Sequence, residues 1–151
     1  MMDIGKMKEE YEKTDFATVY FNPHDKVFRV VTEAKRGLAQ GAIEKPSVVT
    51  DVDFESQIGA VLLRHLDYGR TTKWSPEIAL RLGTPQESRA FTKKHLNVSV
   101  RRLPSRDLIV TPLHHDKGGY TGKKSEEIVV PKDDVPEKIA SALRTAFSKA
   151  T

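Results

Sequence analysis

Residues 96–113 read LNVSVRRLPSRDLIVTPL, and their pattern gives the clearest prediction of the fold. Leu96 to Arg102 alternates apolar and polar side chains, which predicts a strand with one buried face. Pro104-Ser105-Arg106-Asp107 is typical of a turn. Leu108 to Leu113 predicts a second strand, and its Pro112 indicates that this strand ends or lies at an edge of a sheet. The stretch therefore predicts a pair of antiparallel strands.

The rest of the C-terminal half extends this pair. His114 to Lys124 contains three glycines and predicts a polar loop. Glu126 to Val130 predicts a third strand, and Val135 to Lys149 predicts the last helix. The apolar stripe of that helix consists of Ile139, Ala142, Leu143, Ala146 and Phe147. We expect a three-stranded antiparallel meander that carries a terminal helix.

The N-terminal half predicts a hairpin followed by a weaker region. Ala17 to Phe21 and Lys26 to Thr32 are rich in strand formers and flank a good turn sequence. Residues 37–46 contain two glycines and a proline and predict a loop. Ser47 to Val52 predicts a short strand, and residues 1–13 predict a tail or a short helix.

Three helices are predicted between the two halves. The first begins at Asp53 as N-cap, has apolar residues at helical spacing, and ends at Gly69. Ser75-Pro76-Glu77 predicts the start of a short helix. Thr84-Pro85-Gln86-Glu87 predicts another and forms a capping box. Residues 14–151 therefore predict a single α+β domain, a mainly antiparallel sheet packed with two longer helices and two short ones.

Composition limits the class of protein. The chain has 151 residues, which suits one domain with a real core. It has no cysteine, which excludes disulfides and cysteine-ligated zinc. No apolar run approaches the roughly 20 residues of a membrane helix, and the polar N-terminus does not resemble a secretory signal. We expect a soluble, cytoplasmic protein that does not associate with membranes.

One cluster resembles an active site: His114, His115, Asp116, Lys117 and Tyr120. Histidines and carboxylates bind metal ions or transfer protons near neutral pH. This leaves open a small metal-dependent hydrolase or nuclease that uses the first three of these residues. Adjacent histidines on a strand point to opposite faces, however, so we prefer a polar loop without catalytic or metal-ligating residues and without a cofactor.

His65 lies on the apolar face of the first long helix. We expect it at the edge of the core, making one hydrogen bond. His95 is predicted at the end of a helix, where its positive charge would suit the helix dipole.

Basic residues form a second signal. Arg101 and Arg102, with Arg106 and Lys93-Lys94 nearby in sequence, make one basic segment. Lys117, Lys123 and Lys124 make a second basic loop. Such residues bind phosphates or the acidic side chains of a protein partner. The formal net charge is only +4, and no strand shows the aromatic-plus-basic pattern that stacks bases. We do not expect direct nucleic-acid binding, although a basic nucleic-acid-binding module remains an alternative.

Several segments from residue 56 onward resemble a known family. They are SQIGAVLL at residues 56–63, Tyr68-Gly69-Arg70, the strand at 96–102, LIVTP at 108–112, IVVP at 128–131, and the final helix with Ala142-Leu143 and Ala146-Phe147. In these segments the chain is similar to the immunity proteins of bacterial contact-dependent growth inhibition (CDI) systems.

The resemblance implies a cytoplasmic antidote that binds the C-terminal toxin domain of a delivered effector. Such toxins are commonly nucleases, for example tRNases, and the immunity protein occludes the active site or substrate groove. The resemblance implies no catalytic residues, no cofactor, and a monomer or weak dimer. The expected toxin-binding surface comprises His114, His115, Asp116, Lys117, Tyr120, Lys123, Lys124, Arg101 and Arg106.

Overall fold

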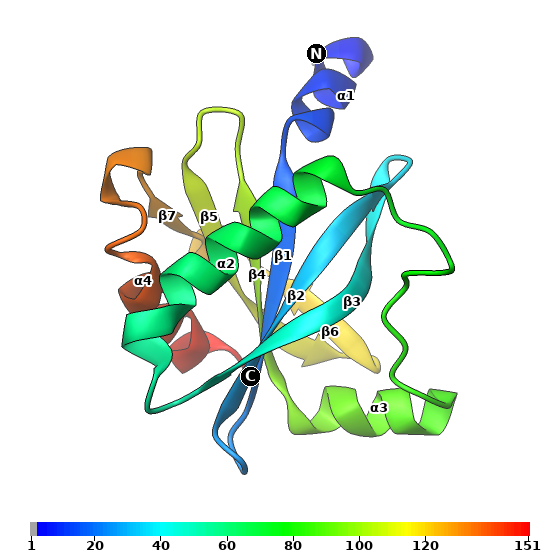
Figure 1. Ribbon diagram of the computed structural model, residues 1–151, viewed down its shortest axis with the longest axis vertical. Coiled ribbons are helices and arrows are strands. Elements are labelled where there is room, and N and C mark those ends of the chain that lie inside the picture. Colours follow the sequence, from blue (N-terminus) through cyan, green and yellow to red (C-terminus); the bar gives the residue numbers. More distant parts are fainter. Residues whose placement is uncertain (1–2) are drawn as a thin grey trace.

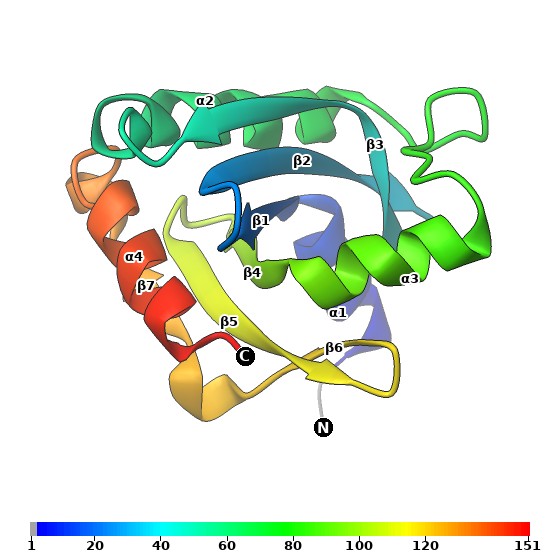
Figure 2. The ribbon, with the colours of Figure 1, turned by 90° about the horizontal axis from the view of Figure 1, so that it is seen from below.

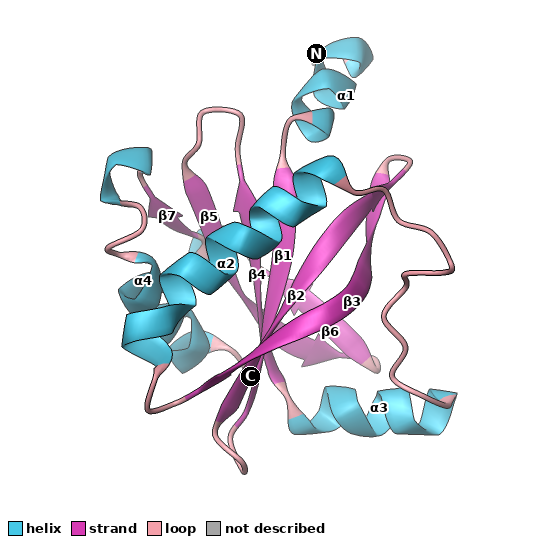
Figure 3. Ribbon diagram, in the orientation of Figure 1, coloured by secondary structure: helices cyan, strands magenta, loops and turns pink. Residues whose placement is uncertain are grey.

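The computed structural model describes residues 3–151 (Figures 1 and 3). Met1 and Met2, the start of the predicted tail, lie outside the described residues. Over residues 3–151 the chain forms an α+β domain with a mainly antiparallel seven-stranded sheet and four helices. The strands are β1 Asp15–Asn22, β2 Val27–Arg36, β3 Ala39–Thr50, β4 Leu96–Arg102, β5 Leu108–Asp116, β6 Gly119–Gly122 and β7 Ile128–Val130. The helices are α1 Ile4–Glu12, α2 Phe54–Thr71, α3 Pro85–Lys94 and α4 Ile139–Lys149, with 3-10 turns at Lys124–Glu126 and Lys132–Asp134.

The strands are ordered β3-β2-β1-β4-β5-β6, and β7 also pairs with β5. β6 pairs with the second half of β5 and β7 with its first half, so both lie along one edge of that strand. The meander of β4, β5 and β7 is thus confirmed, with β6 inserted into it. The predicted hairpin in the first half is confirmed as β1 and β2, which pair from Phe16–Glu33 to Asn22–Val27.

The core lies between the sheet and helices α2 and α4. Helix α2 runs diagonally across β1 and β2 (Figure 1), and α4 packs on β4 and β5. In both helices the apolar residues recur at helical spacing and therefore form one face, and this face is buried against the sheet. All five residues of the predicted α4 stripe are buried, although the helix begins at Ile139 and not at Val135. The largest buried side chains include Phe28, Phe54, Ile58, Leu62, Leu66, Leu108 and Leu143.

The predicted loop at residues 37–46 is wrong, because β3 runs through it without a break. Only Gly37 and Leu38 form the turn, with Gly37 at a φ of +63°. Gly41 is a glycine for a different reason: a Cβ there would lie 2.6 Å from Cδ1 of Trp74. Pro46 is tolerated because β3 is an edge strand.

The helix predicted at Ser75 is also wrong. The backbone of this segment pairs with the sheet instead: Ile78 O accepts from Glu44 N over 2.8 Å, and Leu80 N donates to Ala42 O over 3.0 Å. The predicted capping box of α3 is confirmed, since Thr84 Oγ1 accepts from the backbone N–H of Glu87 and the Glu87 carboxylate accepts from Thr84 N.

Helix α2 differs from its prediction at both ends. Asp53 is the N-cap but makes no capping bond; its carboxylate accepts from the Thr50 hydroxyl over 3.1 Å. The helix continues past Gly69 to Thr71. Gly69 lies where a Cβ would come 3.1 Å from Cγ2 of Thr32, so it permits close packing of α2 on β2.

The polar loop predicted from His114 to Lys124 is a strand hairpin followed by a 3-10 turn. β5 continues to Asp116 and pairs with β6. Lys117 and Gly118 form the two-residue tip, with φ values of 49° and 84°. Positive φ at both central positions is the geometry of a type I′ turn, which matches the twist of paired strands.

Candidate functional site

The residues predicted to bind a partner fall at two ends of β5. Arg106 lies in the turn before the strand, and Arg101 pairs with Ile109 near its start. Lys117 lies in the turn after it. The first and last residues of this nine-residue strand are about 26 Å apart at roughly 3.3 Å per residue. The structure therefore does not bring Arg101 and Arg106 together with the hairpin, and Arg101 instead donates to Glu127 over 3.3 Å.

The two adjacent histidines use their ring nitrogens separately. His114 Nε2 lies 2.6 Å from Glu126 Oε1, and its Nδ1 lies 2.7 Å from Thr151 Oγ1. The hydrogen bond from His114 lowers the pKa of Glu126. His115 Nε2 lies 2.6 Å from Thr92 O, and its Nδ1 lies 2.8 Å from Thr151 O. Within residues 3–151, no three histidine or carboxylate side chains form a metal-ligating group, so His114, His115 and Asp116 do not converge on one point.

The hairpin is fastened to α3 by two side chains. The Tyr120 hydroxyl lies 2.9 Å from O of Thr92, in the last turn of α3, and 2.8 Å from O of His95, the C-cap of that helix. His115 reaches the same Thr92 carbonyl. Burial raises the pKa of Tyr120 to about 12. These hydrogen bonds hold the β5–β6 hairpin beside the C-terminal end of α3, and Figure 2 shows both elements on the same side of the molecule.

His95 caps α3 but does not place a charge there. Its side chain is buried and stacks on Phe91 with ring centroids 3.7 Å apart. Burial lowers its pKa, so the imidazole is neutral near pH 7 and the expected interaction with the helix dipole is wrong.

A cleft of about 340 Å³ lies between α3 and the hairpin. Its lining includes Arg89 and Lys93 from α3 and Asp116 and Lys117 from the hairpin. We call this surface, made of Arg89, Lys93, His115, Asp116 and Lys117, the hairpin face. Among the described residues, no ion pair engages Arg89, Lys93 or Lys117. Lys123 and Lys124 are also exposed, but they follow the far end of β6.

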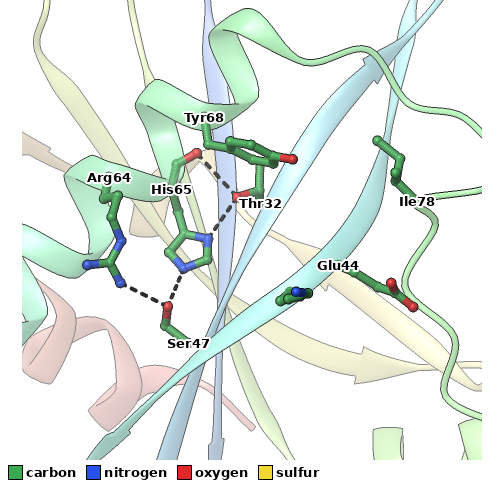
Figure 4. Close-up of a pocket in the computed structure, with 8 residues that line it drawn as sticks. Thr32, Glu44, Ser47, Arg64, His65, Tyr68 and Ile78 are labelled. Carbon is green, nitrogen blue, oxygen red and sulfur yellow. Dashed lines mark hydrogen bonds between the residues drawn. The ribbon is translucent and has the colours of Figure 1, made fainter.

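The structure contains a second cleft, of about 400 Å³, between β3 and α2 (Figure 4). His65 on α2 lies at its base and is only 6% exposed. Its Nδ1 lies 2.7 Å from Thr32 Oγ1 on β2, and its Nε2 lies 2.7 Å from Ser47 Oγ on β3. His65 therefore makes two hydrogen bonds and not the one expected. Burial, with a smaller effect of Arg64, lowers its pKa to about 4.

Local sequence gives no signal for this second cleft. Thr32 and Ser47 both face α2 because they pair with the core-facing positions Ile43 and Val30. Residues 44–46 of β3 stand opposite the single residue Val31, which makes a bulge beside the cleft. The site exists only once strand register and the packing of α2 are fixed.

No helix within residues 3–151 has both the length and the apolar character needed to cross a bilayer. No protein-family model matches the sequence, and no curated protein matches it. A solved structure described as a protein of unknown function, NMB0488 from Neisseria meningitidis, has a similar fold, with a TM-score of 0.71. The two chains are 19% identical over 93% of this chain and 97% of that chain, so what this protein shares with it is the α+β fold alone.

Proposed function

We propose that this chain is an immunity protein, which binds the toxin domain of a contact-dependent growth inhibition effector and occludes its active site or substrate groove. The observation that carries the proposal is the hairpin face. There, exposed cations from α3 and from the β5–β6 hairpin surround one cleft, and no ion pair within residues 3–151 neutralises them. The protein would act in the cytoplasm, as a monomer or weak dimer.

Rigidity of this face favours binding by shape and charge. The hairpin has a type I′ tip, and Tyr120 and His115 hold it to α3 through hydrogen bonds. A surface that is already ordered loses little conformational entropy when a partner binds. Its lysines and arginine speed encounter with a surface of opposite charge. We therefore expect the docking face of the toxin domain to be acidic.

The partner to test is the C-terminal domain of the protein encoded immediately upstream. Calorimetry with the purified domain should give tight one-to-one binding, and coexpression of this chain should restore growth to cells that make the toxin. The triple variant Arg89→Glu, Lys93→Glu, Lys117→Glu should weaken binding about 100-fold or more, since like charges across an interface cost several kcal/mol.

A matched variant separates local charge from net charge. Lys6→Glu, Lys8→Glu, Lys73→Glu changes the formal charge by the same amount at exposed sites away from the hairpin face. It should leave affinity within about threefold, because distant exposed charges are screened by salt. Equal weakening by both variants would contradict the proposed face. The variant Lys123→Glu, Lys124→Glu decides whether the interface extends along β6.

A further control addresses the nucleic-acid alternative. Single-stranded RNA should not bind the chain at low salt if the hairpin face recognises a protein. Binding that weakens steeply with salt and is lost in the hairpin-face triple variant would assign this face to nucleic acid and overturn the proposal.

A further inference from the structure

The second cleft places a serine, a histidine and a threonine in line. Ser47 is partly exposed and lines the cleft, whereas His65 and Thr32 are 6% and 2% exposed (Figure 4). The three side chains come from β3, α2 and β2, and all of them point between the helix and the sheet. None of these residues belongs to the hairpin face.

Four contacts fix where the protons lie. The Thr32 hydroxyl donates to the backbone O of His65 over 3.3 Å, so at 2.7 Å its oxygen accepts the Nδ1–H of the same residue. The lone pair of His65 Nε2 then faces Ser47 Oγ at 2.7 Å. Arg64 Nη2 donates to Ser47 Oγ over 3.1 Å, which leaves the serine proton directed at Nε2. This single assignment makes all four contacts hydrogen bonds.

We propose that Ser47 is a nucleophile that becomes acylated by small activated esters, with His65 as its general base. In this step Ser47 Oγ attacks the ester carbonyl carbon, and its proton passes to His65 Nε2. The bond from that carbon to the alcohol oxygen breaks, the alcohol leaves with the proton from Nε2, and an acyl ester of Ser47 remains. A base held by a third group beside a nucleophile is the general arrangement of such sites.

The other groups of the site have separate roles. Thr32 is a positioning residue, because it fixes the tautomer and the ring plane of His65. The positive charge of Arg64 lies beside Ser47 Oγ and stabilises negative charge that develops on it. Tyr68 and Ile78 line the cleft and supply apolar surface for a short acyl chain, and the volume of about 400 Å³ suits a small substrate.

Burial of His65 sets the expected rate. A neutral imidazole keeps its lone pair available at neutral pH, but the same burial makes the imidazolium costly. The step is therefore slow, and we expect one modification per chain over hours and not rapid turnover.

An alkyl fluorophosphonate probe tests the proposal on the full chain. Phosphorus replaces the carbonyl carbon as electrophile, fluoride leaves, and a stable Ser47 phosphonate ester forms. Intact mass should show one adduct per chain, and peptide mapping should place it on Ser47. Ser56, Ser88 and the other serines act as internal controls. Ser47→Ala should give no adduct.

Three further variants separate chemistry from folding, and each is used only after thermal unfolding shows that it is folded. His65→Gln should slow labelling at least about 100-fold, the usual contribution of a general base. Thr32→Val should slow it, whereas Thr32→Ser, which keeps the hydroxyl, should restore the rate to within about threefold of the original. No adduct on Ser47, labelling spread over several serines, or an unchanged rate in His65→Gln would each assign the network a structural role only and overturn the proposal.

Discussion

Asp15 and Arg102 form a buried ion pair at one end of the two central strands of the sheet. They stand opposite each other on β1 and β4, and Arg102 Nε donates to Asp15 Oδ2 over 2.8 Å. The Asp15 side chain is 0% exposed and that of Arg102 is 4% exposed. Two residues of α2 complete the network: Arg70 lies 3.2 Å from Asp15, and Asp67 lies 2.8 Å from Arg102. The four side chains therefore link α2 to the ends of β1 and β4 through ion pairs.

Breaking this pair should destabilise the fold strongly. Arg102→Met leaves the Asp15 carboxylate buried, with the half-exposed Arg70 as its remaining ion-pair partner among residues 3–151. Removal of one partner of a buried pair costs about 3–5 kcal/mol, which urea unfolding measures. The double variant Asp15→Ala, Arg102→Met should be more stable than Arg102→Met alone, because no buried charge is then left unpaired. Lys13→Ala, which breaks an exposed pair with Glu9, is the control and should cost at most about 0.5 kcal/mol.

Sequence predicts the parts of this fold that depend on local pattern. β4 alternates, the turn before β5 is strongly coded, and the α4 stripe recurs at helical spacing, so all three predictions are confirmed. The predicted strand at Ser47 to Val52 matches the second half of β3, but the first half reads as a loop because glycine and proline usually interrupt strands. Here Gly41 makes room for Trp74, and Pro46 lies on an edge strand, and both reasons depend on residues distant in sequence.

The sequence likewise predicts one candidate site in part and the other not at all. The sequence predicts the basic residues of the hairpin as a candidate binding surface. That they share a cleft with Arg89 and Lys93 depends on how α3 packs against β6. Ser47 and Thr32 carry no motif that points to His65. The three side chains meet because β3 has two extra residues relative to β2 and because His65 lies on the face of α2 that packs on the sheet. His65 then lies 2.7 Å from the hydroxyl oxygen of each of the other two residues.

The capping box of α3 should contribute measurably to stability. Thr84→Ala removes the oxygen that accepts from the Glu87 N–H and should lower the free energy of unfolding by about 1 kcal/mol. Thr84→Ser keeps the oxygen and should change it by no more than a few tenths. Chemical denaturation measures both, and equal losses in the two variants would show that Thr84 acts through its methyl group.

Alkaline titration should reveal the link between the hairpin and α3. Burial raises the pKa of Tyr120 from 10.0 to about 12. The folded state therefore holds the Tyr120 proton at pH values where the unfolded chain has already lost it. The contribution of this group to stability is complete below pH 10 and is lost as the pH rises toward 12. Tyr120→Phe should flatten this alkaline fall in the free energy of unfolding.

Phenolate absorbance provides a second readout of the same linkage. The chain has four tyrosines, and burial also raises the pKa of Tyr11 and Tyr20. Ionisation of the folded protein should therefore lag behind that of the urea-unfolded chain, and the lag should shrink in Tyr120→Phe. Identical titration of the folded and unfolded chains would contradict the burial of these hydroxyls.

Acid should destabilise the protein through His65. Its pKa falls from 6.5 in the unfolded chain to about 4 in the folded one. Between these values the unfolded state binds a proton that the folded state does not, so the stabilisation is complete above pH 6.5 and is lost as the pH falls toward 4. At about 1.4 kcal/mol for each pH unit, the loss is at most about 3 kcal/mol, because solvent in the cleft screens the charge of the imidazolium and makes it less costly.

His65→Gln isolates this effect, because glutamine can still bond to both hydroxyls but does not titrate. Urea unfolding across the same pH range should give a flatter curve for this variant. The part that remains includes His95, whose pKa burial also lowers. A full acid slope in His65→Gln would show that the imidazole is already solvated in the folded protein, and the lone pair assigned to Ser47 would then face water.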